Sequence, residues 1–250
     1  MDTTNAVAIA AALNVAYVAW GYPRKNKIEK NASEGNGEKA TFEFKEIFYV
    51  PNVMDYLRVV FLYLAVSYKD YPFENNAGLN FAMFYTISYL LDAFDGMAAR
   101  ALGQTSHLGY YLDMIIDRIS SALCLYTASE AIKVNGMISQ DLVQPTVYLC
   151  YFLIVTVEIL AHGVVIYNAE VLGIHQKKMG YDFAVVRLYL DSKAMLFYGC
   201  ANFELCLLGI IVNQPLVMLI GLPGLVFRAV ANLARLWACI VLKEDEKKTT

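Results

Sequence analysis

Six long apolar blocks constrain what this chain can fold into more than any other feature of its sequence. They lie near residues 52–69, 77–101, 108–132, 145–169, 194–213 and 216–242. Each approaches or exceeds the ~20 residues that cross a bilayer, and in lipid only a helix satisfies the backbone of such a segment. With 58% hydrophobic residues, the sequence predicts an all-α integral membrane protein, a bundle of six transmembrane helices. Pro51, Pro145 and Pro215 mark expected helix starts or turns.

The first 45 residues are predicted to form an extension to this bundle. Residues 6–21 form an apolar run slightly too short to span, and residues 22–41 are polar and typical of a linker. The apolar run fits either an additional helix or an interfacial helix lying on the membrane. Residues 42–50 are amphipathic and predict a juxtamembrane segment, so we expect an N-terminal extension over 1–45 and a membrane domain over 46–245.

The lysines and arginines predict the orientation of the chain. With the N-terminal tail inside, the inside segments carry most of these residues, whereas the outside turns carry only Lys69 and Lys133. This bias places the connection between the second and third predicted helices at the cytosolic end of the bundle.

Four aspartates flank that connection: Asp92, Asp95, Asp113 and Asp117. The first two are three residues apart and the last two are four apart, so each pair lies on one face of a helix. Ionisable residues inside a membrane are costly and usually functional. Carboxylates that face one another need cations, and oxygen ligands of this kind favour a hard divalent ion such as Mg²⁺ or Mn²⁺.

Small residues and one arginine accompany the acids. Gly96 and Ala99 leave the helix surface bare for a bulky ligand, and Gly109 does the same on the following helix. Arg100 places a guanidinium beside the acids, which suits a diphosphate. The bland alternative is a set of salt-bridged structural charges, with Arg100 and Arg118 as the nearby cations. Two basic residues are few for four acids, so this alternative is disfavoured.

The full pattern is D-x2-D-G-x2-A-R-x8-G-x3-D-x3-D, running from Asp92 to Asp117. It resembles the signature of the CDP-alcohol phosphotransferase family, and the resemblance implies a six-helix membrane enzyme of that fold. The implied reaction attacks the β-phosphate of a CDP-linked lipid, CDP-diacylglycerol, and releases CMP. Asp92, Asp95, Asp113 and Asp117 would hold the metal.

The resemblance also assigns roles to single residues. Asp117, at the far end of the acid row, is the candidate general base for the attacking hydroxyl. The expected contacts with the CDP-lipid are Gly96, Ala99, Arg100, Ser106 and Gly109, of which Ser106 is implied by the resemblance alone. The family further implies a homodimer.

Outside the signature, residues 48–245 resemble the eukaryotic phosphatidylinositol synthases of this family. The similar stretches include V-P-N-V-M-D-Y-L-R-V-V from Val50 and E-I-L-A-H from Glu158. This resemblance implies myo-inositol as the acceptor and the endoplasmic reticulum membrane, or the Golgi, as the location. Arg118, Glu158 and His162 are the candidate acceptor contacts. Each has a structural alternative, namely an ion pair of Arg118 with Asp117 or Glu158 and helix packing for His162. Asn202 and Glu204 are expected to bond across helices or at a subunit interface.

Three residues of the first predicted transmembrane helix remain ambiguous. Asn52 and Arg58 would reach the nucleotide, or Arg58 would be a buried counter-ion to the acids. Asp55 departs from the family pattern, in which many members carry a small residue at this position.

Two rival functions stay open. Another CDP-alcohol phosphatidyltransferase would use glycerol phosphate or serine, and a phosphorylated acceptor would want additional cations such as Lys177, Lys178, Arg187 and Lys193. A transporter would use the acids as a cation path, but it would not need Gly96, Ala99 and Arg100 beside them. The expected partners are CDP-diacylglycerol, myo-inositol and membrane lipids, with no nucleic acid.

Overall fold

The computed structural model describes residues 43–67, 77–172 and 182–249, and all regular structure in these ranges is helical. The described residues divide into two compact units, one up to Ser120 and one from Ser121. The division falls inside one helix, α4 (His107–Val134). The apolar run at 6–21, the linker at 22–41, and Lys69, Lys177 and Lys178 lie outside the described residues.

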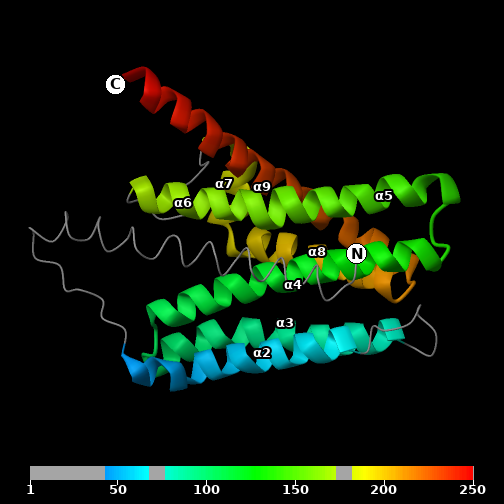
Figure 1. The fold of residues 1–250 in the computed structure, drawn as a ribbon, viewed down its shortest axis with the longest axis horizontal. Coiled ribbons are helices and arrows are strands. Elements are labelled where there is room, and N and C mark those ends of the chain that lie inside the picture. Colours follow the sequence, from blue (N-terminus) through cyan, green and yellow to red (C-terminus); the bar gives the residue numbers. More distant parts are fainter. Residues whose placement is uncertain (1–42, 68–76, 173–181, 250) are drawn as a thin grey trace, which may run out of the picture. The chain divides into compact units, whose positions relative to one another are not determined.

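The first unit contains a short 3₁₀ helix, η1 (Phe44–Phe48), and the helices α2 (Val50–Ser67) and α3 (Ala77–Leu102), followed by the start of α4 (His107–Val134). Pro51 lies in the first turn of α2, where its missing N–H costs nothing. The helices α2 and α3 run side by side (Figure 1). Phe61 stacks on Phe84 with ring centroids 6.4 Å apart, and Ser88 Oγ donates to the Arg58 carbonyl at 3.2 Å.

The turn between α3 and α4 has well-defined caps. Gly103 follows the last residue of α3 with φ +63°, and Gln104 N donates to Ala99 O at 2.9 Å, which is the bonding pattern of a glycine-terminated helix. Ser106 precedes α4, and its Oγ accepts from Gly109 N at 3.0 Å, as an N-cap does. The Gln104 side chain also accepts from Val50 N at 2.9 Å. These bonds fix the start of α2 against the turn.

The second unit contains the rest of α4, then α5 (Gln140–Leu153), the π-helix η3 (Ile154–Ala161), α6 (His162–Leu172), α7 (Ala184–Asp191), α8 (Lys193–Ile211) and α9 (Pro215–Thr249). The predicted block at 145–169 thus begins earlier than expected. Pro145 lies inside α5 instead of at its start, because the preceding polar residues from Gln140 already form the first turn.

Glycines allow α8 and α9 to approach closely. A Cβ at Gly221 would meet backbone atoms of Asn202 and Cys206, and one at Gly224 would meet the Asn202 side chain. Small residues of this kind let membrane helices pack backbone against backbone. Tyr189 of α7 packs against α9, where its ring lies edge-on to that of Phe227 with ring centroids 5.6 Å apart.

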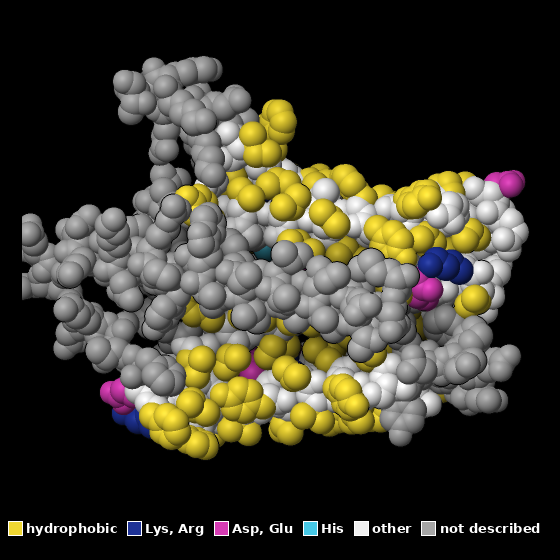
Figure 2. All heavy atoms as spheres, viewed as in Figure 1, with side chains coloured by type: hydrophobic (Ala, Val, Ile, Leu, Met, Phe, Trp, Pro, Cys, Tyr) yellow, Lys and Arg dark blue, Asp and Glu magenta, His cyan; other side chains and the backbone are white. Residues whose placement is uncertain are grey.

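Large apolar side chains remain exposed along the helices. They cover α2 and α5 in Figure 2, and include Leu57, Val60 and Tyr63 on α2 and Tyr148 and Phe152 on α5. Within the described ranges, four helical stretches are long and apolar enough to cross a membrane: Val50–Ser67, Gln140–Asn168, Lys193–Ile211 and Pro215–Ile240. The described chain is therefore an all-helical membrane protein. The sequence of α3 contains Asp92, Asp95 and Arg100, and that of α4 is also rich in charge, which lowers their apolar character.

Candidate active site

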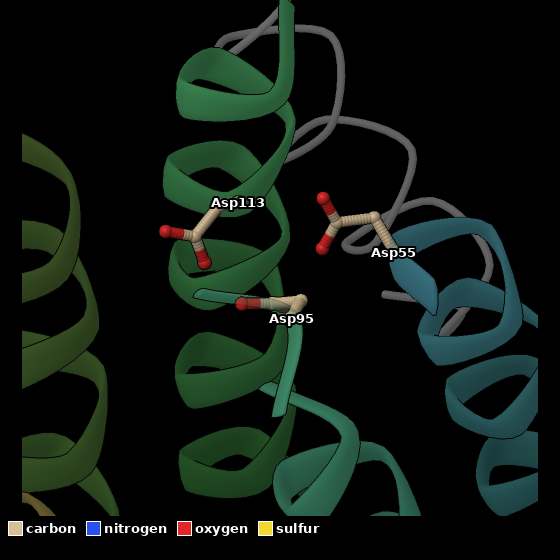
Figure 3. A group of neighbouring side chains, drawn as sticks. All are labelled: Asp55, Asp95 and Asp113. Atoms are coloured by element: carbon tan, nitrogen blue, oxygen red, sulfur yellow. The ribbon is translucent and has the colours of Figure 1, made fainter. Parts of the chain in front are cut away.

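Five buried or half-buried carboxylates gather in the first unit. Asp92 and Asp95 come from α3 and Asp113 and Asp117 from α4, as the spacing of the motif suggested, while Asp55 comes from α2. We call these five residues the acid cluster. Figure 3 shows how Asp55, Asp95 and Asp113 enter one region from three different helices.

The acid cluster contains two sets of possible metal ligands. Carboxylate oxygens of Asp55, Asp95 and Asp113 lie within 4.8 Å of one another, and so do those of Asp92, Asp113 and Asp117. Asp113 belongs to both sets. Oxygen donors at this spacing are the ligands that hard divalent cations prefer.

Arg58 is the basic residue at the centre of the acid cluster. Its Nη1 donates to Asp55 at 3.0 Å, Asp113 at 3.2 Å and Asp95 at 3.3 Å. Its Nη2 lies 2.6 Å from Asp92 Oδ1 and donates to Asp117 Oδ1 at 2.6 Å. Arg58 itself is 2% exposed, so of the two interpretations of this residue the structure favours the buried counter-ion.

One guanidinium does not balance this group. With all five carboxylates ionised, the single Arg58 charge leaves these six side chains with a formal charge of −4. Arg118 adds a weaker contact, 3.5 Å from Asp117 Oδ2. Charges removed from water are costly unless they are paired. The cluster is thus a strong attractor for additional cations.

The small residues of the motif lie next to this cluster. Gly96 is half-buried, and a Cβ placed on it would lie 3.3 Å from Nη1 of Arg100, one turn later on α3. Arg100 is exposed and Ala99 is half-buried. The bare surface expected at Gly96 is therefore partly covered by the Arg100 side chain, which folds back along its own helix.

Gly109 has a tighter environment. A Cβ at this position would lie 2.6 Å from Oδ1 of Asn52, which is fully buried on α2. The Asn52 amide donates to the Glu46 carbonyl at 2.6 Å, so it holds η1 against α2, while its Oδ1 has no hydrogen-bond partner. Gly109 thus makes room for a side chain that links three elements.

The candidate acceptor residues Glu158 and His162 lie in the second unit. Glu158, in the π-helix, is 1% exposed and accepts from Arg228 Nη2 at 3.0 and 3.2 Å. His162 Nδ1 lies 2.7 Å from the Val157 carbonyl, five residues earlier, which fits the wider turn of a π-helix. Glu204 of α8 accepts from Ser121 of α4 at 3.3 Å.

Arg228 completes this second group. It lies 3.7 Å from Glu204, and its guanidinium carbon stacks 3.9 Å from the Phe203 ring centre. Glu204 therefore bonds across helices, as expected, whereas Asn202 donates to Tyr198 within its own helix at 2.9 Å. The sequence reasoning did not single out Arg228. The available signal was a pair of arginines, Arg228 and Arg235, inside the last long apolar block.

Asp55 was also missed as a member of the acid cluster. Asp55 and Arg58 are three residues apart and both are 2% exposed. A charged pair at helical spacing inside the predicted span 52–69 was the signal. Its significance depends on which face of α2 meets α3 and α4, which the spacing does not specify.

Comparison with known proteins places the chain in a family. A sequence model described as CDP-alcohol phosphatidyltransferase matches residues 48–240. The human CDP-diacylglycerol–inositol 3-phosphatidyltransferase is 34% identical over 181 residues, which are 70% of this chain and 76% of the human protein. The Saccharomyces cerevisiae protein of the same name is 29% identical over 230 residues, 87% of this chain and 96% of the yeast protein. No solved structure matches. The chain belongs to the CDP-alcohol phosphatidyltransferase family.

Proposed function

We propose that this protein is a phosphatidylinositol synthase, which transfers the phosphatidyl group of CDP-diacylglycerol to myo-inositol and releases CMP. The observation that carries the proposal is the set of motif acids Asp92, Asp95, Asp113 and Asp117, gathered around Arg58, in a chain whose relatives are named for this reaction. The choice of inositol as acceptor rests on those names.

The donor set fits a divalent cofactor, Mg²⁺ or Mn²⁺. All candidate ligands are carboxylate oxygens, and those of Asp92, Asp113 and Asp117 lie within 4.8 Å of one another, as do those of Asp55, Asp95 and Asp113. Asp92, Asp95, Asp113 and Asp117 would hold the metal. When bound, a divalent ion neutralises charge on the phosphate oxygens and so lowers the barrier to phosphoryl transfer.

The chain itself supplies a base and a grip on the donor. Asp117 Oδ1 is held by Arg58 at 2.6 Å, whereas Oδ2 has the longer 3.5 Å contact with Arg118. Oδ2 is therefore the oxygen better placed to take the proton of the acceptor hydroxyl. The hydroxyl oxygen then bonds to the β-phosphorus, and the bond from that phosphorus to the oxygen of CMP breaks.

The donor would lie along the small residues of the motif. Gly96 and Ala99 offer little side-chain bulk, and the exposed Arg100 guanidinium suits the diphosphate. Gly109 stays a candidate contact, although Asn52 Oδ1 lies where a Cβ of this residue would be. The Oγ of Ser106 already accepts from Gly109 N and so caps α4. Ser106 would therefore contact the donor through the same hydroxyl while it still caps this helix. Arg118, Glu158 and His162 stay candidates for the acceptor, although Glu158 is already paired with Arg228.

The membrane arrangement is part of the proposal. We infer six spans, with α3 and α4 added to the four stretches that are long and apolar enough alone, and a site that opens to the cytosol, where CDP-linked substrates occur. The endoplasmic reticulum membrane, or the Golgi, and a homodimeric assembly are proposed from family membership.

The test is an acceptor panel. Purified protein in detergent is incubated with CDP-diacylglycerol and Mn²⁺ or Mg²⁺, and CMP release is measured with labelled inositol, serine or glycerol phosphate. We expect release with inositol and a labelled lipid product. Release with serine or glycerol phosphate instead would identify a different member of the family. No release with any acceptor would favour a non-catalytic cation pathway.

A further inference from the structure

We propose that Arg58 competes with the divalent metal for the acid cluster, so that the ion binds only as the guanidinium gives up contacts with the carboxylates. Arg58 then sets how tightly the metal is held, in addition to pairing with the acids. The inference deepens the proposed function and rests on it, because it concerns the same metal-dependent site. Arg58 lies on α2, outside the D-x2-D…D-x3-D motif of α3 and α4.

One terminal nitrogen of the guanidinium contacts three of the candidate ligands. Arg58 Nη1 lies 3.0 Å from Asp55 Oδ1 and 3.2 Å from Asp113 Oδ1. It also lies 3.3 Å from Asp95 Oδ2. Carboxylate oxygens of these same three acids, drawn in Figure 3, lie within 4.8 Å of one another. Nη1 therefore takes up oxygens that a divalent ion bound by these acids would need as ligands.

The other terminal nitrogen contacts the remaining two motif acids. Arg58 Nη2 lies 2.6 Å from Asp92 Oδ1 and 2.6 Å from Asp117 Oδ1. Both of these acids belong to the second group of possible ligands, which they form with Asp113. A divalent ion in either group of ligands thus meets a guanidinium that already contacts them. Because like charges repel, the same few oxygens cannot hold both cations equally closely.

The Arg58 side chain is not fully satisfied in this arrangement. Its Nε is buried and has no hydrogen-bond partner among the described residues, although a guanidinium offers five N–H donors. The backbone of Arg58 is held separately, because Ser88 Oγ of α3 donates to its carbonyl at 3.2 Å. A shift of the guanidinium would therefore leave this link between α2 and α3 in place.

A purely structural role of Arg58 leads to the opposite expectation. If Arg58 only held the acids together, its removal would separate the ligands and weaken metal binding. If it competes with the metal, its removal leaves the carboxylates free to bind the ion more tightly. The metal-free protein should then lose stability, since the buried acids lose their counter-ion. The two roles differ in the sign of the change in metal affinity.

The experiment measures the Kd of Mn²⁺ for the full-length protein in detergent. Free Mn²⁺ is followed by electron paramagnetic resonance during a titration of wild type, Arg58→Gln, Arg58→Lys and Arg118→Gln. The last variant is the matched control, because it removes the same charge from a residue with a longer contact, 3.5 Å from Asp117 Oδ2. We expect the Kd to fall by about tenfold or more in Arg58→Gln, and by less in Arg118→Gln.

Two further measurements accompany the titration. Arg58→Lys keeps the charge but not the fork, and one ammonium cannot take the place of both Nη1 and Nη2. Its Kd should lie between those of wild type and Arg58→Gln, and this variant decides if Arg58→Gln does not fold, as judged by size exclusion. In thermal unfolding, Mn²⁺ should raise the melting temperature of Arg58→Gln more than that of wild type, because tighter binding stabilises more.

A Kd in Arg58→Gln that is unchanged, higher, or lowered no more than in Arg118→Gln would overturn the inference. Where Arg58→Lys decides, a Kd no lower than that of wild type has the same consequence. Mn²⁺ that binds none of these proteins contradicts the metal dependence of the site and with it the inference. Wild-type CMP release with inositol is scored separately. Its absence contradicts the proposed function, whereas the Kd of Arg58→Gln concerns only the role of Arg58.

Discussion

Arg228 of α9 donates to both carboxylate oxygens of Glu158 in the π-helix, at 3.0 and 3.2 Å, and both side chains are buried. The same guanidinium also forms an ion pair with Glu204 and donates to Ser121 Oγ. This ion pair joins η3 to α9 within the second unit, and both side chains are shielded from solvent. Its loss should therefore lower the stability of that unit.

Replacing Arg228 alone should destabilise the protein strongly. Arg228→Met leaves the Glu158 charge buried without this partner, and breaking a buried pair costs about 3–5 kcal/mol. The double variant Glu158→Gln with Arg228→Met should recover part of that loss, because the Glu158 charge is gone while Glu204 still lacks its contact with Arg228. Thermal unfolding in detergent measures both. Equal stability of wild type and Arg228→Met would show that the pair does not hold η3 to α9.

The Asp117→Asn variant should separate chemistry from binding. The amide keeps the shape of the side chain and can still contact Arg58, but it cannot accept the hydroxyl proton. We expect CMP release to fall by about 10²–10⁴-fold, the usual contribution of a general base. CDP binding should be largely retained, because Asp92, Asp95 and Asp113 remain as metal ligands. Loss of CDP binding in this variant would instead assign Asp117 a role mainly as a metal ligand.

The Asp92→Asn variant tests the motif ligands directly. Asp92 contacts Arg58 at 2.6 Å and belongs to the set with Asp113 and Asp117. Removing its charge should raise the Mn²⁺ concentration required for CDP binding by at least about tenfold, a change of about 1.4 kcal/mol. Glu204→Gln, a buried acid of the second unit, serves as the matched control and should leave the Mn²⁺ requirement unchanged. An unaltered Mn²⁺ requirement in Asp92→Asn would remove this residue from the ligand set.

Gly109→Ala should be poorly tolerated for a local reason. The added Cβ would lie 2.6 Å from Asn52 Oδ1, and overpacking of this kind typically costs about 1–3 kcal/mol. Asn52→Ala removes the obstructing atom, so Gly109→Ala should cost much less in that background. The melting temperatures of the four proteins in this cycle give the coupling. Additive effects would mean that Asn52 and Gly109 do not contact each other in the folded protein.

Much of the fold could be predicted from the sequence, because an apolar block that crosses a membrane forms a helix over nearly its whole length. The block predicted at 77–101 is the helix Ala77–Leu102, and the block at 216–242 lies within Pro215–Thr249. The exact start of a helix was harder to predict where a proline and the polar residues before it indicated different first turns. Pro145 predicts a helix start or turn, but the helix already begins at Gln140.

The candidate site also has a part that the sequence predicts and a part that it does not. Spacing along one helix brought Asp92 next to Asp95 and Asp113 next to Asp117, because helical periodicity is a local property. The place of Asp55 and Arg58 depends on how α2 is rotated against its neighbours, which no single stretch of sequence records. The π-helix around Glu158 was equally hidden, since one wider turn changes which residues share a face without altering the hydrophobic pattern.

The position of Arg58 also bears on how the chain enters the bilayer during synthesis. The helices α3 and α4 each carry two of the motif carboxylates, and a lone charged segment is poorly accepted by the insertion machinery. The earlier helix α2 brings the guanidinium that contacts all four. We therefore expect α2 to be retained beside the translocation channel until its partners emerge, so that the three segments partition into lipid together rather than one at a time.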